Sequence, residues 1–352
     1  MDDFVPNFEN IEIIKQLYTT KNSSIFLIRN KSNNNTLSIL KGIKKGNVTT
    51  KEVEMIKRER GFYEYNISKK NSLFPYFLNP FKDQENVYME ISFIQGLNLS
   101  QLILNDHLLK FNYSESNLPL YLCLLSQIIS MIDQLHQEGY IYRDLKLNNI
   151  IIDKKLKCYL VDFGFVKHFD DKEKMITSTI CGTLHMKAPE IFGIEKKKNS
   201  HYDGSMVDIY SIGVLMYEMY TGNPPFPYKT EDEDNYSNNV FTGIKDETHF
   251  IDFYGNISNI EDKEIIDNIK DLIKRCMDVD VDKRIKMNEI KNHKLFKGNF
   301  EKFCKMNESL CLGENKHTQD IIKYIEFHGE FEEDYQMSDE KKKMDDMFNQ
   351  FF

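Results

Sequence analysis

The sequence predicts an α+β fold in which a β-rich first part precedes a mainly helical second part. Residues 11–45 alternate apolar stretches with polar turns, as three consecutive strands do, and residues 87–95 have the pattern of a further strand. Residues 51–65 carry apolar side chains at helical spacing. Helical segments follow at 99–110 and 119–138, and the second is apolar enough to form the buried centre of a helical lobe.

Length and composition narrow the class of protein. The 352 residues suffice for one two-lobed enzyme or for two to three ordinary domains. A net charge of −9 argues against nucleic-acid binding, which needs a basic surface. The six cysteines show no paired C-x-x-C spacing, which favours reduced thiols over disulfides or a zinc site. With no apolar run of about 18 residues and no N-terminal signal segment, we expect a cytoplasmic or nuclear protein without a membrane partner.

Two polar turns, each flanked by short apolar strands, predict the functional centre. The first contains Asp144, Lys146 and Asn149, and the second begins at Asp162 and continues with Phe-Gly. Because a buried strand flanks each turn, we expect both to face one cleft. There Asp144 can orient a hydroxyl and accept its proton, Lys146 can neutralise phosphate, and Asn149 with Asp162 can hold a divalent metal through oxygen.

The order Asp-x-Lys-x-x-Asn followed by Asp-Phe-Gly resembles the catalytic and metal-binding loops of eukaryotic protein kinases. The Tyr-Arg-Asp form of the first motif and the Phe-Val-Lys after the second are similar to the AGC group, particularly cAMP- and cGMP-dependent kinase catalytic domains. The resemblance implies a bilobal fold with a small antiparallel β-sheet lobe carrying one main helix and a larger, mainly helical lobe. We expect an extension over 1–10, a catalytic domain over 11–300 divided near 92, and an AGC-type tail over 301–352. The layout resembles a catalytic subunit without cyclic-nucleotide-binding domains.

The resemblance also assigns a nucleotide pocket. Lys41 matches the strand lysine that holds the α- and β-phosphates, and Glu59 matches the helix glutamate that pairs with it. Ile39 stands where the family usually has alanine above the adenine. The expected nucleotide-binding residues are Leu17, Ile25, Ile39, Lys41, Glu59, Ile91, Ser92, Ile94 and Asn98. Ile91 is the expected gatekeeper, Ser92 and Ile94 offer backbone groups to adenine, and Asn98 lies near the ribose.

The phosphate loop departs from the family pattern. Residues 17–26, Leu-Tyr-Thr-Thr-Lys-Asn-Ser-Ser-Ile-Phe, contain no glycine, although the family uses a glycine-rich turn to bring backbone N–H groups close to the phosphates. We therefore expect weakened or unusually shaped ATP binding. A pseudokinase scaffold remains the alternative to an active enzyme, although it does not explain why the residues expected to act in catalysis are all present.

Regulation is expected in two segments. Residues 177–183, followed by Ala-Pro-Glu at 188–190, resemble the AGC activation segment, which implies phosphorylation of Thr179 and pairing of the phosphate with Arg143 and Lys167. The tail contains Phe331-Glu-Glu-Asp-Tyr335, expected to lay an aromatic ring against the nucleotide pocket. It ends with Phe348 and Phe351 in a Phe-x-x-Phe motif, expected to dock beside the helix of Glu59.

Other positions have expected structural roles by the same resemblance. Asp208 matches a buried aspartate that steadies the catalytic loop, and Glu190 with Arg284 matches a buried ion pair. His136 is expected in the core or at a helix end rather than as a ligand. Thr183 is expected to contact Asp144.

The sequence thus predicts a serine/threonine protein kinase that uses ATP with Mg²⁺ or Mn²⁺. Its expected partners are protein substrates, an upstream activating kinase and a regulatory subunit. Glu218 is retained as a reader of basic substrate residues, but Asn148 stands where relatives often have a second acidic reader, so we expect a weakened basic preference. A further alternative is a protein that acts on another kinase through its Phe-rich tail.

Overall fold

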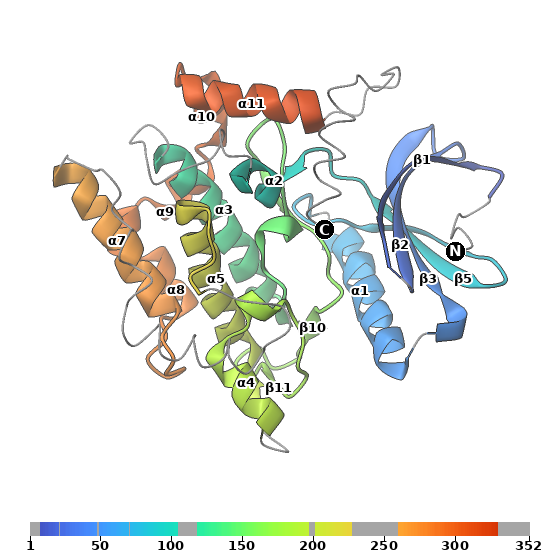
Figure 1. Cartoon of the computed structure of the whole chain (residues 1–352), viewed down its shortest axis with the longest axis horizontal. Helices are drawn as coiled ribbons and strands as arrows, with labels where there is room; N and C mark the ends of the chain where they lie inside the picture. Colours follow the sequence, from blue (N-terminus) through green and yellow to red (C-terminus); the bar gives the residue numbers. More distant parts are fainter. Residues whose placement is uncertain are drawn as a thin grey trace.

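The computed structural model describes residues 8–20, 22–47, 49–69, 71–104, 118–196, 201–226 and 260–329. A small β-rich lobe and a larger helical lobe lie side by side, as Figure 1 shows. The predicted α+β, two-lobed fold is therefore confirmed. The small lobe contains a five-stranded antiparallel sheet of order β1-β2-β3-β5-β4, with β1 Ile11–Thr19, β2 Ser23–Asn30, β3 Thr36–Lys44, β4 Phe77–Lys82 and β5 Asn86–Ser92.

Alternation of side chains across this sheet separates two environments. Phe26, Ile28, Leu40 and Tyr88 form a buried cluster on one face. The residues between them point the other way. On that second face the register places Ile25 opposite Lys41 and Ile39 opposite Ile91, so these four predicted nucleotide-binding residues share one side.

One helix, α1 (Thr50–Lys69), accompanies the sheet and is longer than the predicted 51–65. Its start is fixed by a reciprocal cap. Thr49 donates its N–H and hydroxyl to the Glu52 carboxylate, and the Glu52 N–H donates back to Thr49 Oγ1. The third turn of this helix places Glu59, which is 2% exposed, toward β3.

The large lobe is built around α3 (Leu118–Gln137), which is buried along most of its length, and α5 (Gly204–Thr221). Within the described part of the chain, α3 is the one helix long and apolar enough to cross a membrane by length and composition. Of its most apolar window, 67% is buried inside the protein, as in the core helix of a globular lobe. Helix α7 (Ile260–Cys276) packs against α5 where a Cβ on Gly213 would lie 2.6 Å from Met277. Glycine therefore permits the close approach of these two helices.

Short elements complete the lobe and form the site loops. They are β6 Leu97–Asn98, α2 Leu99–Leu104, β7 Tyr140–Ile141, β8 Ile150–Ile152, β9 Cys158–Leu160, β10 Lys167–His168, β11 Ile176–Thr177, α4 Pro189–Lys196, β12 Tyr202–Asp203 and α8 Met287–Lys291. Sheets β6-β8-β9, β10-β7 and β11-β12 are small and antiparallel.

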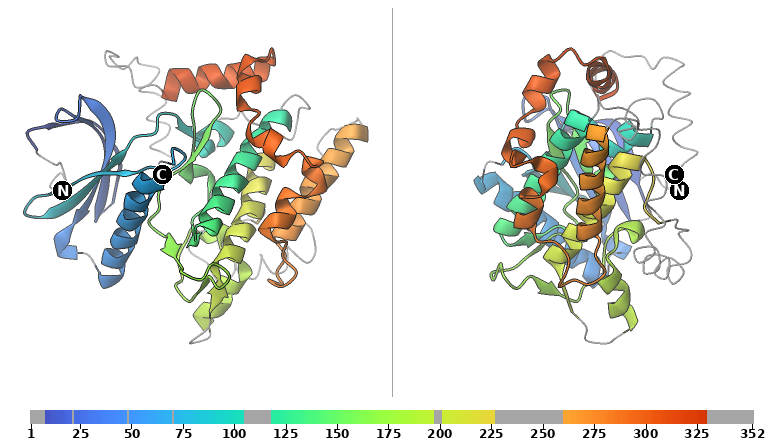
Figure 2. Two further views of the ribbon diagram at one scale, coloured as in Figure 1. Left: turned by 180° about the vertical axis from the view of Figure 1, so that it is seen from behind. Right: turned by 90° about the vertical axis from the view of Figure 1, so that its left-hand side faces the viewer.

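Three helices follow residue 300, in the range expected for the tail. These are α9 (Phe300–Cys304), α10 (Asn307–Leu312) and α11 (Lys316–Gly329), and the first and last bury apolar side chains. Both views in Figure 2 place α11 on the outside of the large lobe. The first part of the expected tail is thus helical.

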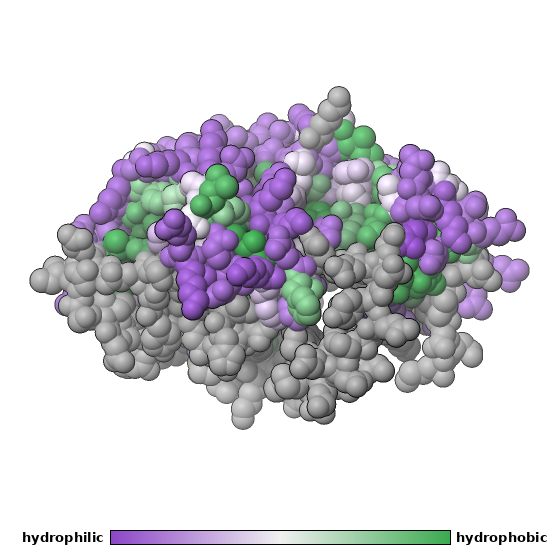
Figure 3. Space-filling view, turned by 90° about the horizontal axis from the view of Figure 1, so that it is seen from above, coloured by the Kyte–Doolittle hydropathy of each residue, from purple (hydrophilic) through white to green (hydrophobic). Residues whose placement is uncertain are grey.

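Seen from above, the described surface is mostly hydrophilic with small apolar areas (Figure 3).

Candidate active site

The loop between β7 and β8 brings Asp144, Lys146 and Asn149 together. The Lys146 ammonium lies 3.0 Å from Asp144 Oδ2, and Asn149 Nδ2 donates to the same oxygen at 2.9 Å and to the Asp144 carbonyl at 2.9 Å. Thr183, from the activation segment, donates to Asp144 Oδ1 at 2.8 Å and accepts from Lys146 at 3.0 Å. A carboxylate held on both oxygens is oriented to accept a proton from a hydroxyl placed beside it.

A buried aspartate holds the backbone of this loop. The Asp208 carboxylate accepts the N–H groups of Tyr142 and Arg143 at 2.9 and 2.7 Å, and it contacts His136 Nε2 at 2.9 Å. Arg143 has φ = 68°, a left-handed conformation that a non-glycine residue adopts at a cost. The hydrogen bonds from Asp208 offset this conformational cost at Arg143. His136 lies in the core as a partner of Asp208 rather than as a ligand of the cleft.

Asp162 follows β9 and faces the cleft from the other side. Its carboxylate is 48% exposed, and Oδ1 lies 3.5 Å from Lys41 Nζ and accepts the Gly164 N–H at 3.3 Å. The Lys41 ammonium holds the pKa of the Asp162 carboxyl below its usual value, so this group stays ionised. An accessible, permanently charged carboxylate is a suitable oxygen ligand for a hard cation.

The donor set fits a divalent metal that is shared with phosphate. Among the residues that the structure describes, no cluster of three or more His, Cys, Asp or Glu side chains forms a closed metal cage. Mg²⁺ is commonly held by one or two carboxylates and completed by water and substrate phosphates, so a cage is not required. Because Asn149 donates through Nδ2, its amide oxygen is the atom that can join Asp162 as a ligand.

Lys41 and Glu59 form a buried ion pair between β3 and α1. The ammonium lies 2.8 Å from both carboxylate oxygens. Burial alone would lower the pKa of Lys41, but Glu59 and Asp162 outweigh burial and raise it above its usual value, so the lysine remains charged. This pair places one cation beside the Asp162 carboxylate, where it can meet anionic oxygens of a phosphate.

Tyr63 completes this pair and was missed by the sequence reasoning. Its hydroxyl donates to Glu59 Oε1 at 3.0 Å, and its fully buried ring lies edge-on to Phe163, 5.8 Å between centroids. The signal was present, because Tyr63 follows Glu59 by one helical turn and must share its face. Tyr63 therefore links the position of the ion pair to the Asp162 loop.

Phe163, next to Asp162, is held inside an aromatic cluster. It stacks on Phe62 with 3.9 Å between ring centroids and 14° between planes. It also meets the rings of Phe74 and Tyr142 edge-on, at 5.5 and 5.3 Å. Rings from α1, the loop of Asp144 and the segment before β4 thus fix the position of Phe163 next to Asp162.

The turn between β1 and β2, predicted to cradle phosphate, engages the backbone N–H groups of Thr20 and Ser23 within itself. The Ser23 N–H donates to Thr20 Oγ1 at 3.0 Å, and the Thr20 N–H donates to the Ser23 carbonyl at 2.7 Å. Thr19 and Ser24 share a hydroxyl hydrogen bond of 2.8 Å. Donors that a glycine-rich loop would direct at a ligand are therefore used inside the turn.

The other predicted nucleotide-binding residues lie in different settings. Ile25, Ile39 and Ile91 line the α1-facing side of the sheet, whereas Leu17 is 45% exposed near the end of β1. The Ser92 N–H is committed to the Tyr76 carbonyl at 3.0 Å. Asn98 accepts the Gln101 N–H at 2.8 Å, which caps α2. Its side-chain oxygen is thus already engaged at the place where a ribose contact was expected.

The activation segment gathers positive charge around Thr179. The Thr179 carbonyl accepts from the Tyr202 hydroxyl at 2.6 Å and from Arg143 Nη1 at 3.5 Å. Lys167 donates to Thr177 at 3.0 Å. Burial, with additional repulsion from Arg143 and Arg58, lowers the pKa of Lys167. Cations that repel one another in a partly buried position favour an anion between them.

Glu218 on α5 lies 3.3 Å from His185 Nε2. Burial raises the pKa of Glu218 to about 8, and burial followed by the nearby Lys146 charge lowers the pKa of His185 to about 4. The distance alone would suit an ion pair, but both groups are uncharged at neutral pH. We therefore interpret the contact as a hydrogen bond from the Glu218 carboxylic acid to the imidazole.

This protonation makes folding stability depend on pH. Below the ordinary Glu pKa of 4.5 the carboxyl is protonated in both folded and unfolded chains, and between 4.5 and about 8 only the folded chain keeps the proton. The contribution of the protonated Glu218 carboxyl to folding stability is thus complete below pH 4.5 and is lost as the pH rises to about 8. We expect wild-type unfolding free energy to fall across this window relative to Glu218→Gln, measured by urea denaturation. Since both proteins contain His185, parallel curves would contradict the Glu218 assignment.

The terminal Phe348 and Phe351, and the segment 331–335, lie outside the described residues. Of the other residues predicted to be regulatory, Arg143 contacts the Thr179 carbonyl, and Lys167 contacts Thr177.

Comparison with known proteins agrees with this geometry. Residues 12–296 match the protein kinase domain. The chain is 35% identical over 222 residues to human cGMP-dependent protein kinase 2, which covers 62% of the chain and 26% of that protein. It is 32% identical over 232 residues to protein kinase 2 of Dictyostelium discoideum, 63% of the chain and 41% of that protein.

A cAMP-dependent protein kinase catalytic subunit-like protein of Caenorhabditis briggsae is 31% identical over 220 residues, 61% of the chain and 49% of that protein. The matched region thus spans less than half the length of each of these relatives. Since the domain match extends through both lobes, the chain belongs to the protein kinase family, and its resemblance to the AGC group is confirmed.

Proposed function

We propose that this chain transfers the γ-phosphoryl group of ATP to serine or threonine hydroxyls of protein substrates, with Mg²⁺ as the preferred ion. The observation that carries the proposal is the convergence of Asp144, Lys146 and Asn149 with the Lys41–Asp162 contact across one cleft. Family membership supports ATP and a divalent metal in general.

In the proposed reaction each side chain acts from the position described above. Asp144, oriented by Thr183 and Asn149, accepts the proton of the substrate hydroxyl. Lys146 stabilises charge that develops on the transferred group, and Lys41, fixed by Glu59, holds the remaining phosphates. Asn149 and Asp162 would hold the metal, which neutralises phosphate charge when bound.

The decisive experiment is Mg²⁺-dependent ATP turnover on a mixed serine/threonine peptide library. Wild-type protein should phosphorylate peptides, and Asp162→Ala should not. Turnover with tyrosine peptides alone would refute the proposed specificity. Absence of turnover in folded protein that carries phosphate on Thr179 would favour the scaffold alternative.

The self-bonded turn of Thr20 and Ser23 favours that second candidate, a pseudokinase scaffold with weak nucleotide binding. Thr20→Ala removes the hydroxyl that occupies the Ser23 N–H and should make this donor available to phosphate. Because one such hydrogen bond is worth about 0.5–1.5 kcal/mol, we expect the Kd for ATP to fall roughly 2- to 10-fold, measured by calorimetry.

Thr36→Ala is the matched control, since Thr36 Oγ1 donates to Asn33 in the neighbouring turn between β2 and β3. An unchanged Kd in Thr20→Ala would show that other features of the loop limit nucleotide binding. Equal gains in both variants would point to a general loosening of the sheet.

We propose that phosphate on Thr179, added by an upstream kinase, switches the enzyme on. The cations of Arg143 and Lys167 support an anion at this position. Thr179→Ala should lower kcat by about 10-fold or more after treatment with an activating kinase, because the segment loses its charge-assisted contacts. Ser178→Ala, one residue away, should retain wild-type kcat, and equal losses in both variants would contradict the assignment.

Substrate preference follows from the protonated Glu218. An arginine side chain must displace its proton before an ion pair forms, so we propose a weak preference for basic peptides near neutral pH. A peptide array with strong arginine selection at two positions would refute this.

A further inference from the structure

The C-terminal end of α1 is tied to the turn that follows α3. The Tyr65 hydroxyl donates to Glu138 Oε2, and the Lys69 ammonium lies 3.4 Å from the same oxygen. Tyr65, Lys69 and Glu138 are here called the α1 latch. Because α1 accompanies the sheet of the small lobe and Glu138 follows α3 in the large lobe, the latch joins the two lobes (Figure 1). All three residues differ from those that form the catalytic cleft.

The latch uses one face of α1, and Glu59 lies on another. Phe62, Tyr65 and Lys69 are spaced by three and four residues, so their side chains form one row along the helix. The rings of Phe62 and Tyr65 both contact Tyr140 of β7, with 5.2 and 5.3 Å between centroids. Glu59 lies roughly a third of a turn from this row and faces β3. Because one helix carries both faces, fixing the row against the large lobe also fixes Glu59.

The Tyr65 hydroxyl is the stronger part of the latch. The side chains of Lys69 and Glu138 are 48% and 33% exposed, and ion pairs at such exposure contribute little. A hydrogen bond to an ionised acceptor is stronger than one between neutral groups. The bond from Tyr65 lowers the pKa of the Glu138 carboxyl below its usual value, so this acceptor is ionised at neutral pH. Lys69 also lies 5.3 Å from the centre of the Tyr65 ring and restrains it.

The large-lobe half of the latch is firmly held. Gly139, next to Glu138, has φ = 80°, and its carbonyl accepts the Phe169 N–H at 2.8 Å. A Cβ at Gly139 would lie 2.5 Å from the Phe169 carbonyl oxygen, so the turn requires glycine. The next residue, Tyr140, pairs with His168 of β10, and the two rings lie 4.6 Å apart. Glu138 therefore offers α1 a fixed anchor.

We propose that Tyr65 and Glu138 are positioning residues that hold α1 where Glu59 meets Lys41. The Lys41–Glu59 pair alone gives the helix one fixed point, about which it can pivot. Tyr65 lies six residues beyond Glu59, about 9 Å along the axis, and supplies a second point. Without the latch, the ion pair should be broken in a fraction of the molecules. In the proposed phosphoryl transfer, on which this role rests, Lys41 must be fixed to hold phosphate.

Acetylation of Lys41 by acetic anhydride, followed by mass spectrometry, reports on the ion pair without ATP or turnover. An ammonium held by both Glu59 oxygens should react slowly, and Lys283, which is 73% exposed, is the internal reference. Tyr65→Phe and Glu138→Gln should each raise the relative rate roughly 3- to 10-fold, the effect of losing one hydrogen bond to a charged group. Glu59→Gln should raise it at least as far, and adding Tyr65→Phe to that variant should change it no further.

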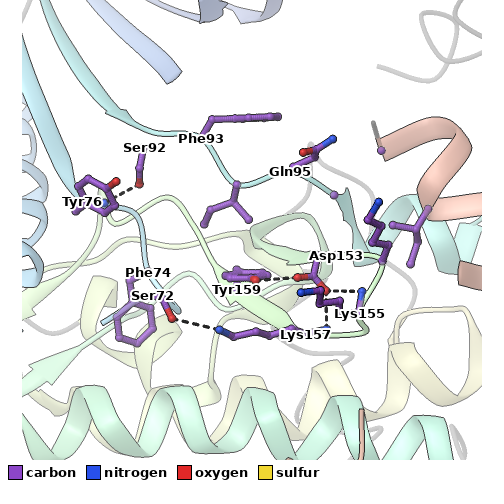
Figure 4. Close-up of a pocket in the computed structure, with 15 residues that line it drawn as sticks. Ser72, Phe74, Tyr76, Ser92, Phe93, Gln95, Asp153, Lys155, Lys157 and Tyr159 are labelled. Carbon is purple, nitrogen blue, oxygen red and sulfur yellow. Dashed lines mark hydrogen bonds between the residues drawn. The ribbon is translucent and has the colours of Figure 1, made fainter. Parts of the chain in front are cut away.

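Tyr159→Phe is the matched control. Tyr159 donates to Asp153 at 2.8 Å, as Figure 4 shows, and Lys157 lies 5.2 Å from the centre of its ring. This group repeats the chemistry of the latch within the large lobe alone. The variant should therefore acetylate Lys41 at the wild-type rate.

Three results would each overturn the positioning role: an equal rise in Tyr159→Phe, unchanged labelling in both latch variants, or a further rise from Tyr65→Phe in the Glu59→Gln background. Urea unfolding identifies a merely structural effect, because a loss of stability should add in that background although the labelling does not. If Tyr65→Phe fails to fold, Glu138→Gln, which keeps the shape of its side chain, decides. Failure of the proposed function would be distinct, since wild-type protein would show the labelling pattern without phosphorylating peptides.

Discussion

Asp144→Asn is expected to lower kcat for peptide phosphorylation by about 10²- to 10⁴-fold, the range typical of removing a general base. The substitution keeps the shape of a side chain that contacts Thr183, Lys146 and Asn149 but removes its charge and proton affinity. Steady-state kinetics at saturating ATP measure the effect.

Two controls separate chemistry from folding. Asp170→Asn alters a carboxylate whose side chain is fully exposed and should leave kcat unchanged. ATP affinity of Asp144→Asn should stay close to wild type, because Lys41 and Asp162 are untouched. A kcat within a few-fold of wild type would remove Asp144 from the proposed role.

Among the substitutions proposed for this chain, Glu190→Gln should produce the largest loss of folding stability, about 3–5 kcal/mol. Glu190 pairs through both oxygens with Arg284, at 2.8 and 2.9 Å, and the Arg284 side chain is completely buried. Removing the carboxylate leaves a guanidinium charge in the core without its counter-ion. Urea denaturation followed by circular dichroism suits this chain, which contains no tryptophan.

Glu64→Gln provides the matched control. Glu64 pairs with Arg60 at 2.8 Å on α1, but both side chains are about half exposed. Exposed pairs of this kind contribute about 0.3–0.5 kcal/mol. Similar losses in the two variants would show that burial does not set the strength of the Arg284 pair.

Local patterns predicted that the turns of Asp144 and Asp162 face one cleft. Asp144 and Asp162 each lie in a turn beside a short apolar strand, and packing of those strands brings the turns to one cleft. The pairing of Lys41 with Glu59 was expected from the resemblance to protein kinases, and the two side chains lie 2.8 Å apart in the structure. These contacts depend on elements that are close in sequence or strongly patterned.

Strand β4 was not predicted, and its composition explains why. Phe77–Lys82 contains Pro80 and buries few of its residues, so it lacks the alternation of a half-buried strand. It forms the edge of the sheet, next to β5, where a missing N–H is tolerated. Such a strand is specified by its neighbour rather than by its own residues.

The segment between β5 and α2 was only partly predicted. The expected ribose contact of Asn98 could not account for its use as a cap of α2, which depends on where that helix begins. The packing of Gly329 on Gly96 joins residues far apart in the chain. Contacts of this range are decided by tertiary packing, which sequence periodicity does not record.

The stacking of Phe163 affects which inhibitors this protein can bind. A compound that requires the Phe163 ring to move out of its cluster must break its contacts with Phe62, Tyr63, Phe74 and Tyr142. At about 0.5–1.5 kcal/mol for each ring pair, the cost is roughly 2–6 kcal/mol, or between one and four orders of magnitude in affinity. Chemical screens should therefore select compounds that fill the cleft and leave this ring in place.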